Sequence, residues 1–244
     1  MQIRMLLSAL AMICVLPLAP APANAGSFQK VLDRAGIAYS VPTSGKAILV
    51  NIPAFEMILF RDGAPVMRSR VIVGAPWHRT PRLNTHVSAV RFRPTWRPTP
   101  SMIASGEYRN YTRPPGLKNP LGLAAVRLAP GMLVYLHDTN RRQLFEKDER
   151  ALSHGCIRVH KWAELVAFVL DMDLAQVHKL ANGRRTFDAP APPIPVELGY
   201  YTRFPDATGR IISHPDIYGL NSGAGLQNNN QQTDRIACSV TRPD

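Results

Sequence analysis

The pattern of apolar and polar residues in the first half of the chain predicts a series of β-strands. Short segments rich in valine, isoleucine, leucine and phenylalanine are separated by glycine, proline, asparagine and aspartate, which is typical of β-structure. Arg61-Asp62-Gly63-Ala64 places a glycine between two such segments and so predicts a hairpin. The strands predicted here lie near residues 47–52, 55–60, 65–73, 85–93, 125–128 and 132–136.

The spacing of apolar residues becomes helical after Val159. Apolar residues three and four positions apart line one face of a helix, and two helices are predicted in this part, the second ending at Asn182-Gly183. A proline-rich link and a last hairpin follow. The two helices, the link and the two hairpin strands are predicted at 162–170, 174–180, 189–195, 196–204 and 210–213. The sum is a mainly β domain with an inserted helical pair, built as a β-sandwich or an open barrel.

Residues 1–25 have the features of a secretory signal peptide. Arg4 precedes an apolar run from Met5 to Leu18, and the segment ends in Ala23-Asn24-Ala25. A run of about 14 apolar residues is short for a bilayer-spanning helix. We therefore expect cleavage after Ala25, export, and membrane contact only during export.

The segments on either side of the main domain differ from it in composition. Residues 26–45 contain one short apolar-periodic piece and are expected to form an N-terminal arm. Residues 221–244 are rich in asparagine, glutamine, glycine and serine, which predicts a flexible tail. The main domain is therefore expected to span 46–220.

The chain is strongly basic, with a formal net charge of +12 that falls to +11 when Arg4 leaves with the signal peptide. In an exported protein such a charge favours anionic polymers of the cell envelope as partners. A role in solubility alone is an equally good interpretation. Nucleic acid is not expected as a partner, because it would suit an intracellular protein.

Removal of the signal peptide would leave two of the three cysteines, Cys156 and Cys238. Two cysteines in an oxidising compartment pair by default. Cys238, however, lies in the predicted tail, and spacing alone does not decide pairing. We expect the Cys156 thiol to be free, with a Cys156–Cys238 disulfide as the alternative.

Ser153-His154-Gly155-Cys156-Ile157-Arg158-Val159 is the segment with the clearest chemistry. A cysteine thiol has a pKa of about 8.5 and needs a neighbouring base to become a good nucleophile. A buried structural cysteine is the alternative, but polar neighbours argue against an apolar setting. Cys156 is therefore the predicted nucleophile.

His137, nineteen positions before Cys156 and at the end of a predicted strand, is the candidate general base. A third group must fix its tautomer, and Asp138, Asn140 or a backbone carbonyl could do so. His154 could itself be the base. Alternatively, backbone N–H groups of the turn could form an oxyanion hole, in which one donor is worth about 3 kcal/mol; the donors would be those of His154, Gly155 and Cys156.

Arg158 suits a substrate carboxylate, although a salt bridge with Glu146, Asp148 or Glu149 is the alternative. A zinc site was also considered, because imidazole and thiolate are zinc ligands. The possible ligands would be His137, His154, Cys156 and His160. No CxxC or HExxH spacing is present, so we expect no metal and no organic cofactor.

The cysteine segment, preceded by His137, resembles the active-site signature of the L,D-transpeptidases, the YkuD-type catalytic domain. The resemblance covers nearly all of residues 46–220 and is strongest for the larger, periplasmic Gram-negative branch. The segments that carry it are Ile48-Leu49-Val50-Asn51-Ile52-Pro53, Val71-Ile72-Val73-Gly74, Thr80-Pro81, Pro94-x-Trp96-x-x-Pro98, Asn119-Pro120-Leu121-Gly122, Leu136-His137-Asp138-Thr139 and Asp216-Ile217-Tyr218-Gly219.

The resemblance implies a β-sandwich with a helix beside the active site, located in the periplasm. The implied reaction cross-links peptidoglycan peptide stems. Cys156 would form a thioester with a tetrapeptide stem and release D-alanine, and an amine of a second stem would then take the acyl group. His137 would be base and then acid, oriented by a backbone carbonyl. The expected substrate-binding residues are Ser153, Arg158, Asn140 and Trp96.

Two departures from the larger branch leave alternatives open. Extra scaffold and wall-binding domains are not expected before the catalytic one, and the long lid of that branch is reduced to a loop from Ser101 to Lys118, which we call the lid loop. If water rather than an amine reached the thioester, the protein would be a thiol-dependent carboxypeptidase or amide hydrolase. An inactive wall-binding module is a third alternative.

Overall fold

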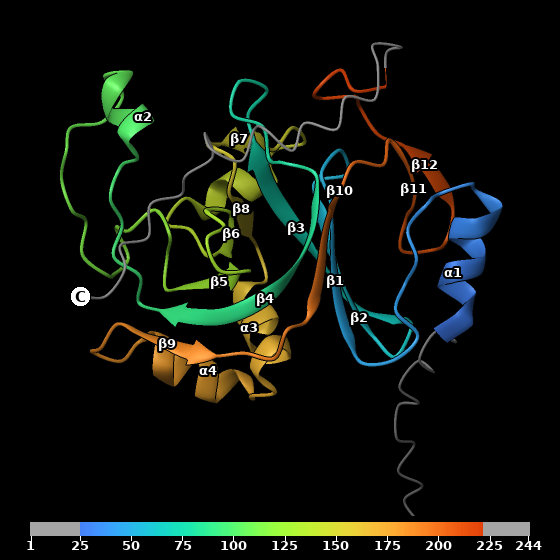
Figure 1. The fold of residues 1–244 in the computed structure, drawn as a ribbon, viewed down its shortest axis with the longest axis horizontal. Coiled ribbons are helices and arrows are strands. Elements are labelled where there is room, and N and C mark those ends of the chain that lie inside the picture. The colour runs from blue at the N-terminus through green and yellow to red at the C-terminus, as the bar shows by residue number, and fades with distance from the viewer. Residues whose placement is uncertain (1–24, 222–244) are drawn as a thin grey trace, which may run out of the picture.

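The computed structural model describes residues 25–221 of the chain (Figure 1). Apart from Ala25 and Asn221, the predicted signal peptide and tail lie outside this range. None of the helices in the described part is long and apolar enough to cross a membrane.

One β-sheet that closes on itself forms the body of the described structure. Strand β10 pairs in parallel with β1 on one side and antiparallel with β4 on the other, so the order β10-β1-β2-β3-β8-β6-β5-β4 returns to its start. Short strands β7 and β9 add to β3 and β4. The bounds are β1 (Lys46–Asn51), β2 (Glu56–Arg61), β3 (Ala64–Gly74), β4 (Leu83–Phe92), β5 (Ala124–Leu128), β6 (Tyr135–His137), β7 (Ala151–Ser153), β8 (Ile157–Val159), β9 (Phe187–Pro190) and β10 (Pro195–Gly199).

The mainly β class predicted from the sequence is confirmed, and the hairpin at Arg61-Asp62-Gly63-Ala64 joins β2 to β3. Asp62 and Gly63 both have positive φ, at 50° and 79°, which matches the twist of a tight hairpin. The two-layer sandwich stays a prediction, because hydrogen bonding joins the main strands into one closed sheet.

Several short strands differ from the prediction. β7 and β8 have only three residues each and owe their order to pairing with β3 and β6; segments this short carry no readable period. β9 lies partly in the predicted proline-rich link and pairs with β4. The sequence also predicts neither of two short helical turns, α2 (Pro100–Ala104) and η1 (Arg142–Glu146).

The strand predicted at 196–204 is divided into β10 and β11 (Arg203–Pro205), and β11 forms a separate hairpin with β12 (Ile211–Ser213). Two hydrogen bonds to Asn51 explain this division. The side chain of buried Asn51 donates to the carbonyl of Tyr201 and accepts from its N–H. These two bonds satisfy the backbone at the point where the chain leaves the sheet.

Two helices follow β8, where the apolar spacing predicts them: α3 (Trp162–Leu170) and α4 (Leu174–Ala181). Asp173 begins α4 with a capping box, in which its carboxylate accepts from the N–H of Gln176. Val166, Val169 and Val177 of this pair belong to the same buried cluster as the inward residues of the sheet. The helices therefore help to bury the main core.

Helix α1 (Ala25–Arg34) lies against the other side of β1 and β2, on the right of Figure 1. Phe28 and Leu32 from α1 pack with Ile58, Phe60 and Phe204 in a second buried cluster. The expected arm thus contains a helix that covers apolar side chains of the sheet.

The end of β3 is tied to the cysteine turn by a chain of hydrogen bonds. The N–H of Gly74 donates to Thr80 Oγ1 at 2.9 Å, and Thr80 Oγ1 donates to the carbonyl of Gly155 at 2.8 Å. Tyr218 Oη accepts from the Thr80 N–H and donates to the Gly74 carbonyl. A Cβ on Gly74 would lie 2.0 Å from the carbonyl oxygen of His78, so this close approach requires glycine.

We predict that Gly74→Ala destabilises the fold, because the added methyl group would overlap backbone atoms of 78–80. Overpacking of this kind costs about 1–3 kcal/mol. Urea unfolding of the two proteins measures the difference. Gly26→Ala is the control, since its Cβ would meet no atom within 4 Å. Equal stability of Gly74→Ala and the wild type would show that the 75–80 segment is not held in this way.

Candidate active site

The turn before Cys156 is shaped by Ser153 and Gly155. Ser153 Oγ donates to the carbonyl of Cys156 at 2.6 Å and accepts from the N–H of Gly155 at 3.1 Å. Gly155 has φ +107°, which L side chains rarely adopt. Ser153 is buried and both its bonds lie within the turn. Its predicted contact with substrate stays a prediction, and the structure shows it supporting the turn.

Cys156 lies directly before β8, and its sulfur contacts the backbone of the β6 segment. Sγ is 3.4 Å from the N of Tyr135, and the side chain is 2% exposed. Cys156 is disulfide-bonded in this structure, which departs from the expected free thiol. The other two cysteines, Cys14 and Cys238, lie outside the described residues. A nucleophilic role requires the reduced thiol.

His137 ends β6, the strand that runs parallel to β8. The register pairs Leu136 with Ile157 and His137 with Arg158, so the histidine ends one strand and the cysteine directly precedes the neighbouring strand. Nδ1 of His137 is 2.5 Å from the carbonyl oxygen of Asp138. Of the three orienting groups considered, a backbone carbonyl is the one found. Because Nδ1–H donates to it, Nε2 keeps its lone pair and can act as a base.

The pKa of His137 is lowered to about 3, by burial first and then by the charge of Arg158. The imidazole is therefore neutral at physiological pH. A neutral imidazole is the form that can accept a proton from a thiol.

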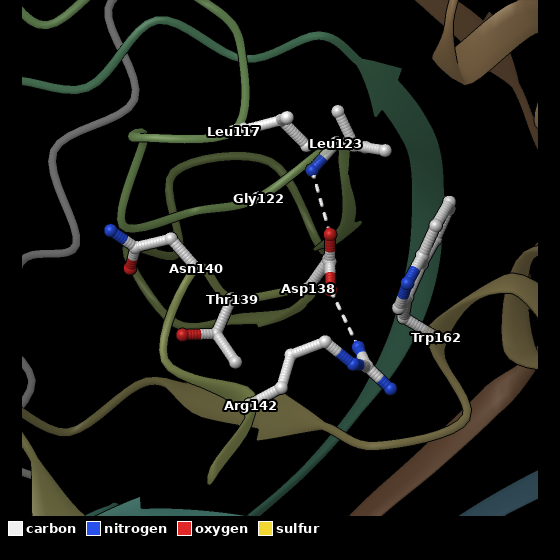
Figure 2. Close-up of a pocket in the computed structure, with 8 residues that line it drawn as sticks. All are labelled: Leu117, Gly122, Leu123, Asp138, Thr139, Asn140, Arg142 and Trp162. Atoms are coloured by element: carbon white, nitrogen blue, oxygen red, sulfur yellow. Dashed lines mark hydrogen bonds and ion pairs between the residues drawn. The ribbon is translucent and has the colours of Figure 1, made fainter. Parts of the chain in front are cut away.

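Asp138 holds the carbonyl that orients His137. Its carboxylate accepts from the N–H of Leu123 at 3.0 Å and pairs with Arg142 at 3.0 Å (Figure 2). Burial raises the pKa of Asp138, although these two partners favour its charged form. These contacts fix the segment whose carbonyl accepts from His137, the candidate base.

Arg158 pairs with His137 in the β6–β8 register and places a positive charge beside it. Its Nη1 is buried and has no hydrogen-bond partner among residues 25–221. The alternative salt bridge with Glu146 is wrong, since Glu146 pairs with Arg70. Burial, and then the nearby charge of Arg141, lowers the pKa of Arg158 to about 10. An uncompensated guanidinium at this place suits a carboxylate ligand.

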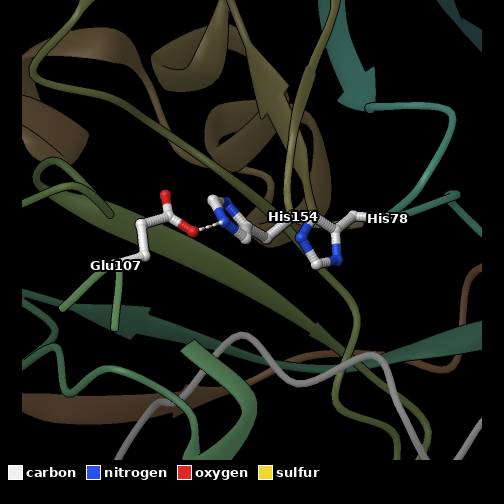
Figure 3. Close-up of side chains that lie close together, drawn as sticks. All are labelled: His78, Glu107 and His154. Atoms are coloured by element: carbon white, nitrogen blue, oxygen red, sulfur yellow. Dashed lines mark hydrogen bonds and ion pairs between the residues drawn. The ribbon is translucent and has the colours of Figure 1, made fainter. Parts of the chain in front are cut away.

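The His154 side chain contacts the lid loop and the connection after β3. Its Nε2 lies 2.7 Å from a carboxylate oxygen of Glu107, and its ring stacks on His78 at 4.5 Å between centroids (Figure 3). The His154 side chain is therefore held by its contacts with Glu107 and His78. These contacts argue against a role as the base.

Trp96 lies before the lid loop and packs against it. Its indole is 4% exposed and makes edge contacts with Tyr108 and Tyr111, and its backbone pairs with Arg113. Figure 1 shows α2 in a segment that extends away from the sheet. Burial favours a supporting role for Trp96, and its predicted contact with substrate stays a prediction.

Asn140 is exposed and lines a pocket of about 250 Å³ beside the base-bearing strand (Figure 2). The pocket combines an apolar wall with polar groups from the segment after His137. Its residues are Leu117, Gly122, Leu123, Asp138, Thr139, Asn140, Arg142 and Trp162. Neither Cys156 nor His137 lines this pocket. The pocket therefore lies beside the candidate reacting groups and does not contain them.

The four zinc ligands considered from the sequence do not gather in one place. Within the described residues, the group able to hold a metal ion is His78, Glu107 and His154. The sequence analysis identified none of His78, Glu107 and Arg141 as site residues. These residues are brought near the cysteine segment by the fold, and not by their position in the sequence. The one sequence feature that pointed to this region was the polar composition of the lid loop. It predicted that the loop has a functional role but identified no particular residue.

Three comparisons with known proteins bear on this site. A family model described as the L,D-transpeptidase catalytic domain, YkuD, matches residues 45–186. A Haemophilus influenzae protein named as a candidate L,D-transpeptidase is 29% identical over 229 residues, with 76% of this chain and 47% of the relative covered. The chain therefore spans about half the length of this curated relative.

Solved structures with similar folds include an L,D-transpeptidase from Mycobacterium smegmatis and L,D-transpeptidase 1 from Mycobacterium tuberculosis. The first is 18% identical with a TM-score of 0.42, and covers 64% of this chain and 59% of its own. The second is 18% identical with a TM-score of 0.35, and covers 64% and 61%.

The buried neutral His137 predicts a pH-dependent stability. The unfolded chain protonates this histidine near pH 6.5 and the folded protein only near 3, so the free energy of unfolding falls as the pH decreases through that window. Compared with His137→Gln, the wild type should lose about 1.4 kcal/mol more per pH unit there. Urea titrations across the window measure both slopes.

The exposed His86 provides the control. His86→Gln should keep the wild-type slope. If His137→Gln and the wild type had the same slope, His137 would not be held neutral in the fold.

Proposed function

Because the chain belongs to the YkuD family of L,D-transpeptidase catalytic domains, we propose that it transfers acyl groups between peptidoglycan peptide stems through the reduced Cys156. The observation that carries the proposal is the pairing of β6 with β8. It brings an oriented, neutral His137 and an uncompensated Arg158 next to the Cys156 turn. A nucleophile, a base and a carboxylate-binding cation are the groups that this reaction needs.

The first half of the reaction forms a thioester. The Cys156 thiol gives its proton to Nε2 of His137, and the sulfur attacks the carbonyl carbon before the terminal D-alanine of a tetrapeptide stem. The tetrahedral intermediate collapses as His137 returns the proton to the leaving nitrogen. D-Alanine departs as a free amino acid, and the stem remains joined to sulfur.

The second half transfers the stem. An amine of a second stem attacks the thioester carbonyl and gives its proton to His137. The carbon–sulfur bond breaks, the thiolate takes the proton back, and a new amide cross-link has formed. Water in place of the amine would yield a carboxypeptidase, and this remains the second candidate function.

Burial of the site supports a base that works from the neutral state. A histidine with a lowered pKa is a weak base in the resting enzyme, but attack creates negative charge beside it that favours its protonation. A substrate carboxylate at Arg158 would offset the positive charge that now lowers the pKa of His137. Substrate binding thus strengthens the base.

The backbone N–H groups of the turn are the proposed oxyanion donors. The N–H of Gly155 donates to Ser153 Oγ in this structure. To serve the intermediate it must exchange that bond for one to the oxyanion, and a small rotation of the turn would suffice. His154 and Cys156 are the other proposed donors, as the family resemblance implies.

The proposed setting is the periplasm, reached with the signal peptide at residues 1–25. The net charge, +11 after loss of Arg4 with the signal peptide, supports contact with an anionic wall polymer. The proposed substrate-binding residues are Arg158 and Asn140, with Ser153 and Trp96 supporting the turn and the lid loop.

We predict that the reduced protein converts tetrapeptide-bearing muropeptides into cross-linked dimers with release of free D-alanine, detected by mass spectrometry. Cys156→Ala should reduce turnover by at least about 1,000-fold, as for other covalent nucleophiles, and omission of the reductant should also lower it. Tripeptides without dimers would establish the hydrolase instead. Full turnover by Cys156→Ala would exclude the thiol mechanism.

We predict that Arg158→Gln has two separable effects. The kcat/KM for tetrapeptide stems falls about 10-fold or more, as expected for the loss of a charge-assisted pair. The acid limb of its pH profile moves to higher pH, because the charge that lowers the pKa of His137 is gone. Arg185→Gln, at an exposed arginine beyond α4, is the control and changes neither. An unmoved acid limb would show that Arg158 does not act on the base.

A further inference from the structure

Three segments far apart in the sequence bring metal-ligating side chains together beside the cysteine turn. His78 comes from the connection between β3 and β4, Glu107 from the lid loop, and His154 from the turn itself (Figure 3). One ligand atom from each lies within 4.8 Å of the others. His154 occupies the middle, with Glu107 on one side and His78 on the other.

Two imidazoles and one carboxylate are a known donor set for zinc, with a fourth position left for water or another ligand. Ligand atoms about 2.1 Å from a tetrahedral ion lie about 3.4 Å apart. The His154–Glu107 contact is shorter than this at 2.7 Å, and all three ligand atoms lie within 4.8 Å of one another. Small rotations of these half-exposed or exposed side chains would bring the atoms to the spacing of a tetrahedral site. An ion can reach it from solvent, because none of the three residues is buried.

The alternative is an ordinary ion pair between His154 and Glu107 with a stacked histidine beside it. That arrangement explains the 2.7 Å contact between His154 and Glu107. It gives the His78 ring no ion pair or hydrogen bond among the described residues. A neutral imidazole nitrogen is a common metal ligand, so a bound ion would give His78 a role within this cluster.

We propose that His78, Glu107 and His154 form a binding site for a divalent cation of the zinc type, which fastens the lid loop to the cysteine turn. The bound ion replaces the contact between His154 and Glu107 with bonds from both to the metal, and it adds His78. Since His154 is two residues before Cys156, the ion would hold the lid loop beside the nucleophile. The inference rests on this cluster alone and does not depend on the proposed reaction.

The test is a calorimetric titration with Zn²⁺ at neutral pH, on tag-free protein that carries Cys156→Ala so that no active-site thiolate can bind the ion. We expect one ion per chain. In the same background, His78→Ala and Glu107→Gln should each weaken binding by about 10-fold or more. His86→Ala, which removes an exposed histidine elsewhere on β4, should leave it unchanged.

Absence of binding, or equal binding by His78→Ala and its parent, would overturn the proposal. Far-ultraviolet circular dichroism of each variant confirms that it is folded. Hydrogen exchange of the parent provides an independent measurement that needs no further variant. Saturating Zn²⁺ should slow exchange in residues 101–118 by about 10-fold, and unchanged exchange there would show that an ion, even if bound, does not fasten the lid loop.

Discussion

The parallel pairing of β6 with β8 is the constraint on which the site depends. Only two residue pairs define it, Leu136 with Ile157 and His137 with Arg158, yet it joins a histidine and a cysteine nineteen positions apart. Both strands have three residues and would not form alone. They are held because β5 and β3 flank them in a closed sheet. The geometry of the reacting groups is therefore a property of the whole sheet.

Burial decides the electrostatics of the site. His137 and Arg158 lie side by side, and the cost of burying like charges is avoided because the histidine stays neutral. The guanidinium remains charged, and its buried Nη1 has no hydrogen-bond partner among residues 25–221. Such an arrangement is unfavourable for stability taken alone, and it is the kind of local cost that functional sites carry. An anionic ligand would relieve it.

The sequence predicted which residues have suitable chemistry better than it predicted which residues contact one another. Cys156 and His137 could be named as candidates because thiol and imidazole chemistry is specific and the surrounding motif is distinctive. The carbonyl that orients His137 could be named only as one of three options, since a backbone direction depends on the turn after β6. Ser153 and Trp96 are both buried, which a linear motif cannot show, and their contact with substrate stays a prediction. His78 and Glu107 carried no local signal, because three separate segments bring them to His154.

The closure of the sheet has a consequence for how the chain acquires its structure. β1 and β10 are neighbours in space, yet their paired residues Ile48 and Val196 stand near opposite ends of the described chain. Contacts so distant in sequence form late, because a long loop must be ordered first. The ring cannot close until residue 199 is available, so the strands that flank the β6–β8 pair are joined into a closed sheet only after residues 46–199 have all been made. Until then the candidate site lacks the support of the complete sheet.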